Sequence, residues 1–142
     1  MKEGKYVIVH LDDSPLAREL VRDALQEEGF IVYSAQDAQD FEQRLMADDT
    51  VRAEVDMFVL DMEMPDLMGA QVGAVMQSVY EELANVPFVI YSGKDREWVE
   101  NMSQEVSELS EEYNENHKGY ISKGQGAEEA LVKRVKEVLG AE

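Results

Sequence analysis

The chain has 142 residues, a length that fits one domain with a single hydrophobic core. Its 13 basic and 31 acidic residues give a formal net charge of −18, which disfavours binding to nucleic acid or to anionic lipid. No apolar run is long enough for a transmembrane helix, the polar start leaves no room for a signal peptide, and no cysteine is present for disulfides. We therefore expect one cytoplasmic domain over residues 1–142, without nucleic-acid or membrane binding.

Short apolar runs alternate with amphipathic stretches along the whole chain. The runs predict buried strands, and the stretches between them predict helices. The predicted strands are Lys5–Leu11, Phe30–Ser34, Met57–Asp61, Pro87–Ser92 and Gly119–Ser122. Strands that are apolar throughout are typical of a parallel sheet covered by helices on both faces.

A helix is predicted after each strand. Ser14 and Pro15 begin the first, as N-cap and first helical residue, and Gly29 ends it. Asp37 caps the second, the third runs from about Gly69 to Leu83, and Gly140 ends the last. The apolar residues expected on these helices are Leu16, Leu20, Val21, Ala24 and Leu25; Phe41, Leu45 and Met46; Val72, Val75, Met76 and Val79; Trp98, Met102, Val106, Leu109 and Tyr113; and Leu131, Val132, Val135, Val138 and Leu139.

Five β-α units predict an open, doubly wound sheet, since a closed eight-stranded barrel needs about 250 residues. The functional site of such a fold lies beyond the carboxyl ends of its strands. The polar residues at those ends are Asp12, Asp13, Asp61, Ser92 and Lys123. We expect them to converge at one edge of the sheet.

These residue types suit phosphoryl chemistry. A carboxylate can act as a nucleophile and form an aspartyl phosphate. Clustered carboxylates repel one another unless a cation lies among them, and Mg²⁺ takes oxygen ligands while sharing its coordination sphere with phosphate. A lysine supplies positive charge to a phosphate oxygen, and a serine hydroxyl can donate a further hydrogen bond.

Four short segments resemble the receiver domain of response regulators. They are Asp12-Asp13-Ser14-Pro15, Asp61-Met62-Glu63-Met64-Pro65-Asp66-Leu67-Met68-Gly69, Ser92-Gly93 and Tyr120-Ile121-Ser122-Lys123. The Asp-x-x-x-Pro-x-x-x-Gly spacing after an apolar strand is the most specific of them, and the resemblance covers almost the whole chain. It implies a flavodoxin-like, five-stranded parallel sheet in the order 2-1-3-4-5 with five helices.

The resemblance also implies roles for individual residues. Asp61 would be the phosphoacceptor, and Lys123 would hold a phosphate oxygen. Asp13 would bind Mg²⁺ (or Mn²⁺) directly and Asp12 largely through water, with Asp61 and the backbone carbonyl of Glu63 completing the protein ligands. Ser92 would also bind the phosphoryl group, and together with Tyr120 it would form the switch.

Two features depart from the family pattern. Glu63 and Lys94 occupy positions that tune phosphate lifetime in the family, and we expect them either to pair across the mouth of the site or to be simply solvated. The segment from Ser92 to Lys123 is longer than usual by roughly two helical turns, so residues 95–118 form an extended fourth-helix region. We expect its Trp98 and Tyr113 to lie in the core, with a docking surface as the alternative.

The expected function is that of a signalling domain, with no enzymatic activity beyond self-phosphorylation from small donors and self-dephosphorylation. Its partners would be a histidine kinase or histidine phosphotransfer protein and a downstream effector, and the chain would be a monomer or weak dimer. One alternative is a pseudo-receiver scaffold. Another is a small haloacid-dehalogenase-like phosphatase. Its Asp-x-Asp nucleophile motif is not matched, because Glu63 occupies the position two residues after Asp61. His10, inside the first strand, is expected to be a buried, hydrogen-bonded residue without a catalytic role.

Overall fold

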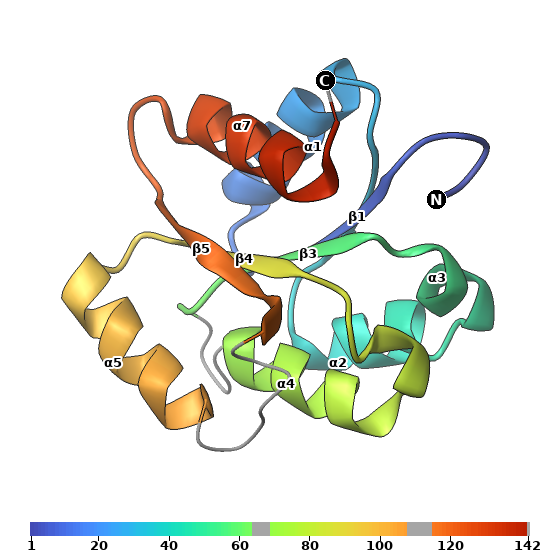
Figure 1. Cartoon of the computed structure of the whole chain (residues 1–142). Helices are drawn as coiled ribbons and strands as arrows, with labels where there is room; N and C mark the ends of the chain where they lie inside the picture. Colours follow the sequence, from blue (N-terminus) through green and yellow to red (C-terminus); the bar gives the residue numbers. More distant parts are fainter. Residues whose placement is uncertain (64–68, 108–114, 142) are drawn as a thin grey trace.

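The structure is a computed structural model that describes residues 1–63, 69–107 and 115–141. Figure 1 labels its elements. The strands are β1 Val7–Leu11, β2 Ile31–Ala35, β3 Met57–Leu60, β4 Phe88–Ser92 and β5 His117–Ser122. The helices are α1 Pro15–Glu27, α2 Ala38–Asp40, η1 Phe41–Met46, α3 Asp49–Glu54, α4 Gly69–Val79, η2 Glu81–Leu83, α5 Arg96–Ser107 and α7 Ala127–Leu139.

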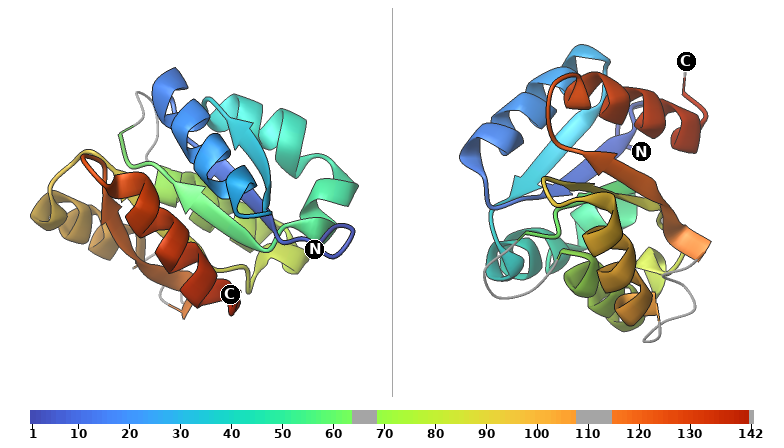
Figure 2. Two further views of the ribbon diagram at one scale, coloured as in Figure 1. Left: turned by 90° about the horizontal axis from the view of Figure 1, so that it is seen from above. Right: turned by 90° about the vertical axis from the view of Figure 1, so that its left-hand side faces the viewer.

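The five strands form one parallel sheet in the order β2-β1-β3-β4-β5, which confirms the predicted fold. Helices α1 and α7 cover one face, and α2, η1, α3, α4 and α5 cover the other (Figures 1 and 2). Strands β1, β3 and β4 are buried along their whole length. Burial on both faces is the reason that they read as uninterrupted apolar runs.

The ends of the first and last helices follow the predicted signals. The Ser14 side chain accepts a hydrogen bond from the Ala17 amide, which satisfies one of the free N–H groups of α1. Gly140 adopts a left-handed conformation with φ of 70° at the C-terminus of α7. Among the described residues, no helix is long and apolar enough to cross a membrane.

The second and third helices were each predicted as one continuous helix, but the structure divides both regions into shorter elements. The second is divided into the short helix α2, the π-helical turn η1 and a further helix α3 that was not predicted. The third ends at Val79, and the 3₁₀ turn η2 follows it. The fourth is confirmed as far as Ser107, whereas Leu109 and Tyr113 lie outside the described residues.

Two predicted apolar faces are partly wrong. On α1 the buried row is Ala17, Val21 and Leu25, while Leu16 and Leu20 are exposed. The sheet contacts the middle of the apolar stripe, so one edge of the stripe faces solvent.

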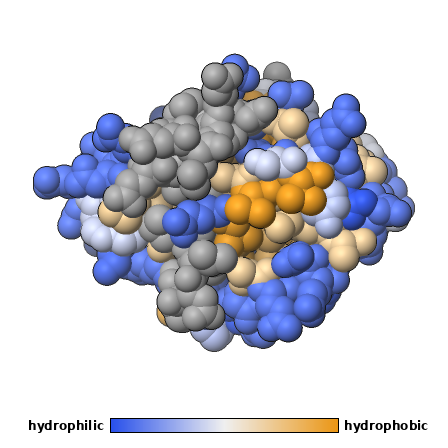
Figure 3. Space-filling model, turned by 90° about the horizontal axis from the view of Figure 1, so that it is seen from below, coloured by the Kyte–Doolittle hydropathy of each residue, from blue (hydrophilic) through white to orange (hydrophobic). Residues whose placement is uncertain are grey.

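On α4, Val72 and Met76 are buried, but Val75 and Val79 are 53% and 64% exposed. Helix α4 lies at the bottom of Figure 1, and the view from below in Figure 3 shows a hydrophobic patch that adjoins hydrophilic residues. The hydrophobic stripe of α4 is therefore wider than the surface that it buries against the sheet.

Candidate functional site

The predicted polar residues meet at the carboxyl edge of the sheet. Asp12 follows β1, Asp61 follows β3, Ser92 ends β4 and Lys123 follows β5. Backbone hydrogen bonds fix their spacing: the Asp61 amide donates to the Leu11 carbonyl at 3.0 Å, and the Lys123 amide donates to the Ser92 carbonyl at 2.9 Å. Asp12, Asp61 and Ser92 are completely buried.

Three carboxylates form a cluster suited to a divalent cation. Asp12, Asp13 and Asp61 each present one oxygen, and these oxygens lie within 4.8 Å of one another. Asp12 and Asp61 are buried, whereas Asp13 is exposed at the mouth of the site. A donor set made only of carboxylate oxygens, open to water on one side, fits the preferences of Mg²⁺.

Lys123 supplies positive charge to the buried acids. Its Nζ lies 2.8 Å from Asp12 Oδ2 and 3.6 Å from Asp61 Oδ2. Burial alone would lower the pKa of Lys123, but the two carboxylates outweigh burial and raise it, so the ammonium stays charged. The lysine therefore partly neutralises the cluster.

The two buried acids differ in their affinity for protons. Burial raises the pKa of Asp12, but contacts with His10 and Lys123 and the hydrogen bond from the Ser14 amide outweigh burial and lower it to about 2. Burial, followed by the negative charge of Asp12, raises the pKa of Asp61 to about 6. Of these two acids, Asp61 is therefore the one whose ionised form is stabilised more by additional positive charge.

Gly69 explains one part of the Asp-x-x-x-Pro-x-x-x-Gly spacing. Its amide donates to the Asp61 carbonyl oxygen at 2.7 Å. A Cβ atom at position 69 would lie 2.1 Å from that same oxygen, which is too close for any side chain. The glycine therefore lets the beginning of α4 pack directly against the backbone of Asp61.

Glu63 and Lys94 do not form the predicted ion pair. The Glu63 amide donates to Asp61 Oδ1 at 3.1 Å, and a Cβ atom on Gly93 would lie 3.1 Å from Glu63 Oε2. The Lys94 ammonium instead lies 5.4 Å from the centre of the Trp98 ring, a cation–π contact. Glu63 consequently lines the site, while Lys94 contacts α5.

Tyr120 connects β5 to the loop after β4. Its hydroxyl donates to the Lys94 carbonyl oxygen and lies 3.5 Å from the Ser92 carbonyl oxygen. The Lys94 amide in turn donates to Ser92 Oγ at 3.3 Å. The Arg96 guanidinium lies 5.8 Å from the Tyr120 ring centre. The two predicted switch residues thus contact the same short loop.

Two residues that the prediction did not place in the site contact Asp12. His10 Nε2 lies 3.3 Å from Asp12 Oδ2, and Arg18 donates to the Asp12 carbonyl oxygen at 2.8 Å. His10 is buried, as expected, and its Nε2 faces Asp12, whereas Nδ1 has no hydrogen-bond partner among the described residues. Side chains two residues apart in a strand share a face, and this spacing was the available signal.

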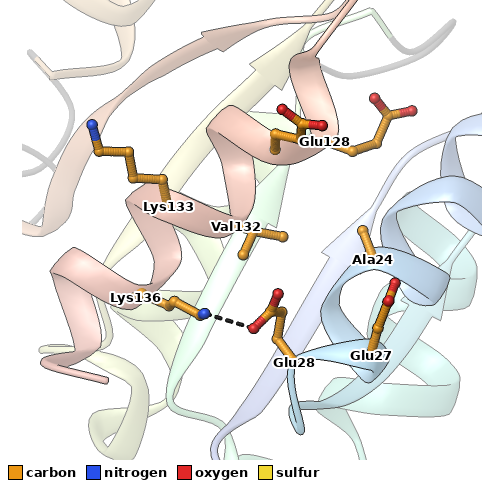
Figure 4. Close-up of a pocket in the computed structure, with 8 residues that line it drawn as sticks. Ala24, Glu27, Glu28, Glu128, Val132, Lys133 and Lys136 are labelled. Atoms are coloured by element: carbon orange, nitrogen blue, oxygen red, sulfur yellow. Dashed lines mark hydrogen bonds and ion pairs between the residues drawn. The ribbon is translucent and has the colours of Figure 1, made fainter. Parts of the chain in front are cut away.

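A separate groove lies between α1 and α7 and shares no residue with the carboxylate cluster (Figure 4). It is lined by Ala24, Glu27, Glu28, Glu128, Glu129, Val132, Lys133 and Lys136. Lys136 Nζ pairs with Glu28 Oε2 at 2.6 Å across the groove. This ion pair links the two helices on their side of the sheet.

Comparison with known proteins identifies the family. The model of the response regulator receiver domain matches residues 8–136, and the chain belongs to this family. Receiver domains are signalling domains of two-component systems. No curated protein sequence gives a significant match.

Solved structures share the fold at low sequence identity. The chemotaxis protein CheY4 of Vibrio cholerae has a TM-score of 0.75 and 18% identity, with 96% of this chain and 100% of that chain covered. A CheY-like receiver domain protein from Methanospirillum hungatei has a TM-score of 0.72 and 18% identity, with 96% and 95% covered. The response regulator TrrA of Thermotoga maritima, solved with Mg²⁺-BeF, has a TM-score of 0.69 and 22% identity, with 94% and 99% covered.

Proposed function

We propose that this chain is a phospho-accepting response regulator in which Asp61 receives a phosphoryl group from a phosphohistidine donor. The main supporting observation is the arrangement around Asp61. Lys123 Nζ lies 3.6 Å from Asp61 Oδ2, and one oxygen each of Asp12, Asp13 and Asp61 lie within 4.8 Å of one another. TrrA, a receiver of the same fold, was crystallised with Mg²⁺ and a beryllium fluoride. This supports the same type of group at the equivalent edge of this sheet.

The proposed chemistry follows from the positions of the side chains. A carboxylate oxygen of Asp61 attacks phosphorus, an O–P bond forms and the P–N bond to the donor imidazole breaks, so that the electron pair leaves with the imidazole. Asp12, Asp13, Asp61 and the Glu63 carbonyl would hold Mg²⁺ (or Mn²⁺), which supplies charge neutralisation to the transferring group. Lys123 would bind a second phosphoryl oxygen as a point charge.

The signal would pass through the loop after β4. Ser92 Oγ would turn from the Lys94 amide towards the phosphoryl group, and the loop would move with it. Tyr120 would follow, because its hydroxyl is bonded to the Lys94 carbonyl of that loop. The receiver would then present this face to a downstream effector, after contact with a histidine kinase or phosphotransfer protein.

Glu63 and Lys94 would set how long the phosphate lasts. Glu63 is the stronger candidate, because its amide bonds Asp61 while Lys94 lies over Trp98. The measurement is the decay rate of phosphorylated Glu63→Ala and Lys94→Ala proteins. A changed lifetime in Glu63→Ala supports the assignment, and unchanged decay in both variants would remove it.

Intact-protein mass spectrometry after incubation with acetyl phosphate tests the phosphoacceptor. We expect one added phosphoryl group that requires Mg²⁺, is absent in Asp61→Asn and is retained in Asp37→Asn, a matched change at an exposed helix cap. If no adduct forms and beryllofluoride does not bind either, the pseudo-receiver alternative holds. Steady turnover of small phosphate esters would instead indicate a phosphatase.

A further inference from the structure

His10 is a polar residue in a strand that is otherwise apolar and completely buried. It precedes Asp12 by two positions, so both side chains project from the same face of the chain. Its Nε2 lies 3.3 Å from Asp12 Oδ2, whereas Nδ1 has no hydrogen-bond partner among the described residues. Buried polar groups are normally hydrogen-bonded, so the retention of an imidazole here calls for a specific reason.

The surroundings of Asp12 provide this reason. Oδ1 accepts a hydrogen bond from the Ser14 amide at 3.0 Å, and Oδ2 is shared between His10 and Lys123, whose Nζ lies at 2.8 Å. In the proposed function Lys123 turns to a phosphoryl oxygen. His10 cannot follow it, because its ring is enclosed in the core and meets Tyr91 edge-on at 6.3 Å. His10 is therefore the protein contact that Asp12 Oδ2 keeps when Lys123 moves to the phosphoryl group.

The contact also defines which nitrogen carries the proton. A nitrogen lone pair facing an anionic oxygen would repel it, whereas an N–H attracts it. The proton of the ring therefore belongs on Nε2, the nitrogen that faces Asp12.

We propose that His10 is a positioning residue, which holds the Asp12 carboxylate in place for a divalent cation through an Nε2–H group. This rests on the proposed function, in that Asp12 helps to bind the cation. A partner behind a metal ligand fixes its orientation, and the loss of such partners typically weakens metal binding by 10- to 100-fold.

The tautomer of His10 can be read without metal or phosphate. Long-range ¹H–¹⁵N spectra of imidazole-labelled protein in EDTA near neutral pH should show a proton on Nε2 of His10. A ring whose Nε2 carries no proton would overturn the inference. Because the experiment needs no variant, it does not depend on how His10 substitutions fold.

Mg²⁺ binding, followed by calorimetry, tests the consequence. Position 10 is changed to Gln, which can place an N–H near the Nε2 position, or to Leu, which cannot. We expect His10→Leu to bind Mg²⁺ about 10-fold more weakly, His10→Gln within about threefold of the wild type, and His117→Leu to be unchanged. His117 is a suitable control because it begins β5, at the opposite end of the sheet from Lys123.

Each outcome separates this inference from the proposed function. Equal affinity in wild type and His10→Leu, or equal loss in the Leu and Gln variants, would sink the positioning role and leave the receiver chemistry standing. A wild-type protein that binds no Mg²⁺ would overturn the cation site and, with it, this role for His10.

Discussion

Asp61 carries a charge that the fold disfavours. Its pKa is raised from 3.8 to about 6, so the native state keeps a proton between these values that the unfolded chain has lost. Folding stability therefore falls as the pH rises through this window, and the penalty is complete above it. In the proposed function, cation binding and phosphoryl transfer would both use this disfavoured charge.

Removing the charge should stabilise the protein. We expect Asp61→Asn to unfold at higher urea concentration than wild type in EDTA at about pH 7.5, by roughly 3 kcal/mol at most, with a smaller difference near pH 5. Saturating Mg²⁺ should reduce the gap, because it stabilises only the wild-type cluster. A variant that is less stable than wild type at both pH values would show that the Asp61 charge is not a burden.

Gly69 provides a second test at the scale of single residues. A Cβ atom there would collide with the Asp61 carbonyl oxygen at 2.1 Å, whereas at Gly73 it would meet only the end of the Leu60 side chain at 2.8 Å. We expect Gly69→Ala to lower the unfolding free energy by about 2 kcal/mol or more and to slow phosphorylation. Gly73→Ala should cost less, since alanine favours the helix. Equal effects in both variants would contradict the proposed close packing.

Only one of the apolar rows of α1 packs against the sheet. Ala17, Val21 and Leu25 face the sheet, whereas Leu16 is 63% exposed. We expect Leu25→Ala to cost about 2–5 kcal/mol and Leu16→Ala about 0.5 kcal/mol or less in urea unfolding. A large loss from Leu16→Ala would mean that the wrong row has been assigned to the core.

The sequence alone was sufficient for the strands and for the main acidic site. Strands such as β3 and β4 are buried on both faces and consist almost entirely of apolar residues, and parallel topology brings the polar ends of the strands together. The helix faces were harder, because Leu16–Leu20 and Val21–Leu25 have the same four-residue spacing and only the approach of the helix to the sheet selects one row. The break at Phe41–Met46 had no marker such as proline or glycine.

Contacts between elements were also outside the reach of sequence patterns. Lys94 has two possible partners, because Trp98 lies four residues further along the chain and Glu63 lies nearby in the fold. Nothing in the sequence indicates that Lys94 contacts Trp98 instead of Glu63. The contact of His10 with Asp12 could have been suspected from the two-residue spacing, whereas the contact of Tyr120 with the Lys94 carbonyl depends on the register of β4 and β5.

At the scale of the whole molecule, the net charge of −18 opposes compaction. We expect the urea midpoint to rise as monovalent salt screens this repulsion. Mg²⁺ should raise it further than NaCl at matched ionic strength, because specific binding adds stability that grows with the ratio of ligand concentration to Kd. Asp61→Asn should lose most of the additional stabilisation by Mg²⁺ and keep the stabilisation that comes from ionic screening. Identical effects of the two salts on wild type would contradict a specific cation site.

Reductive trapping locates the phosphorylated residue of the chain. Borohydride converts an acyl phosphate on aspartate to homoserine, which peptide mass spectrometry locates to a single position. After acetyl phosphate and Mg²⁺ treatment, we expect homoserine at position 61 and at no other acidic residue. Trapping at another residue, or no trapping although an intact adduct is present, would contradict the assignment of Asp61 as the phosphoacceptor.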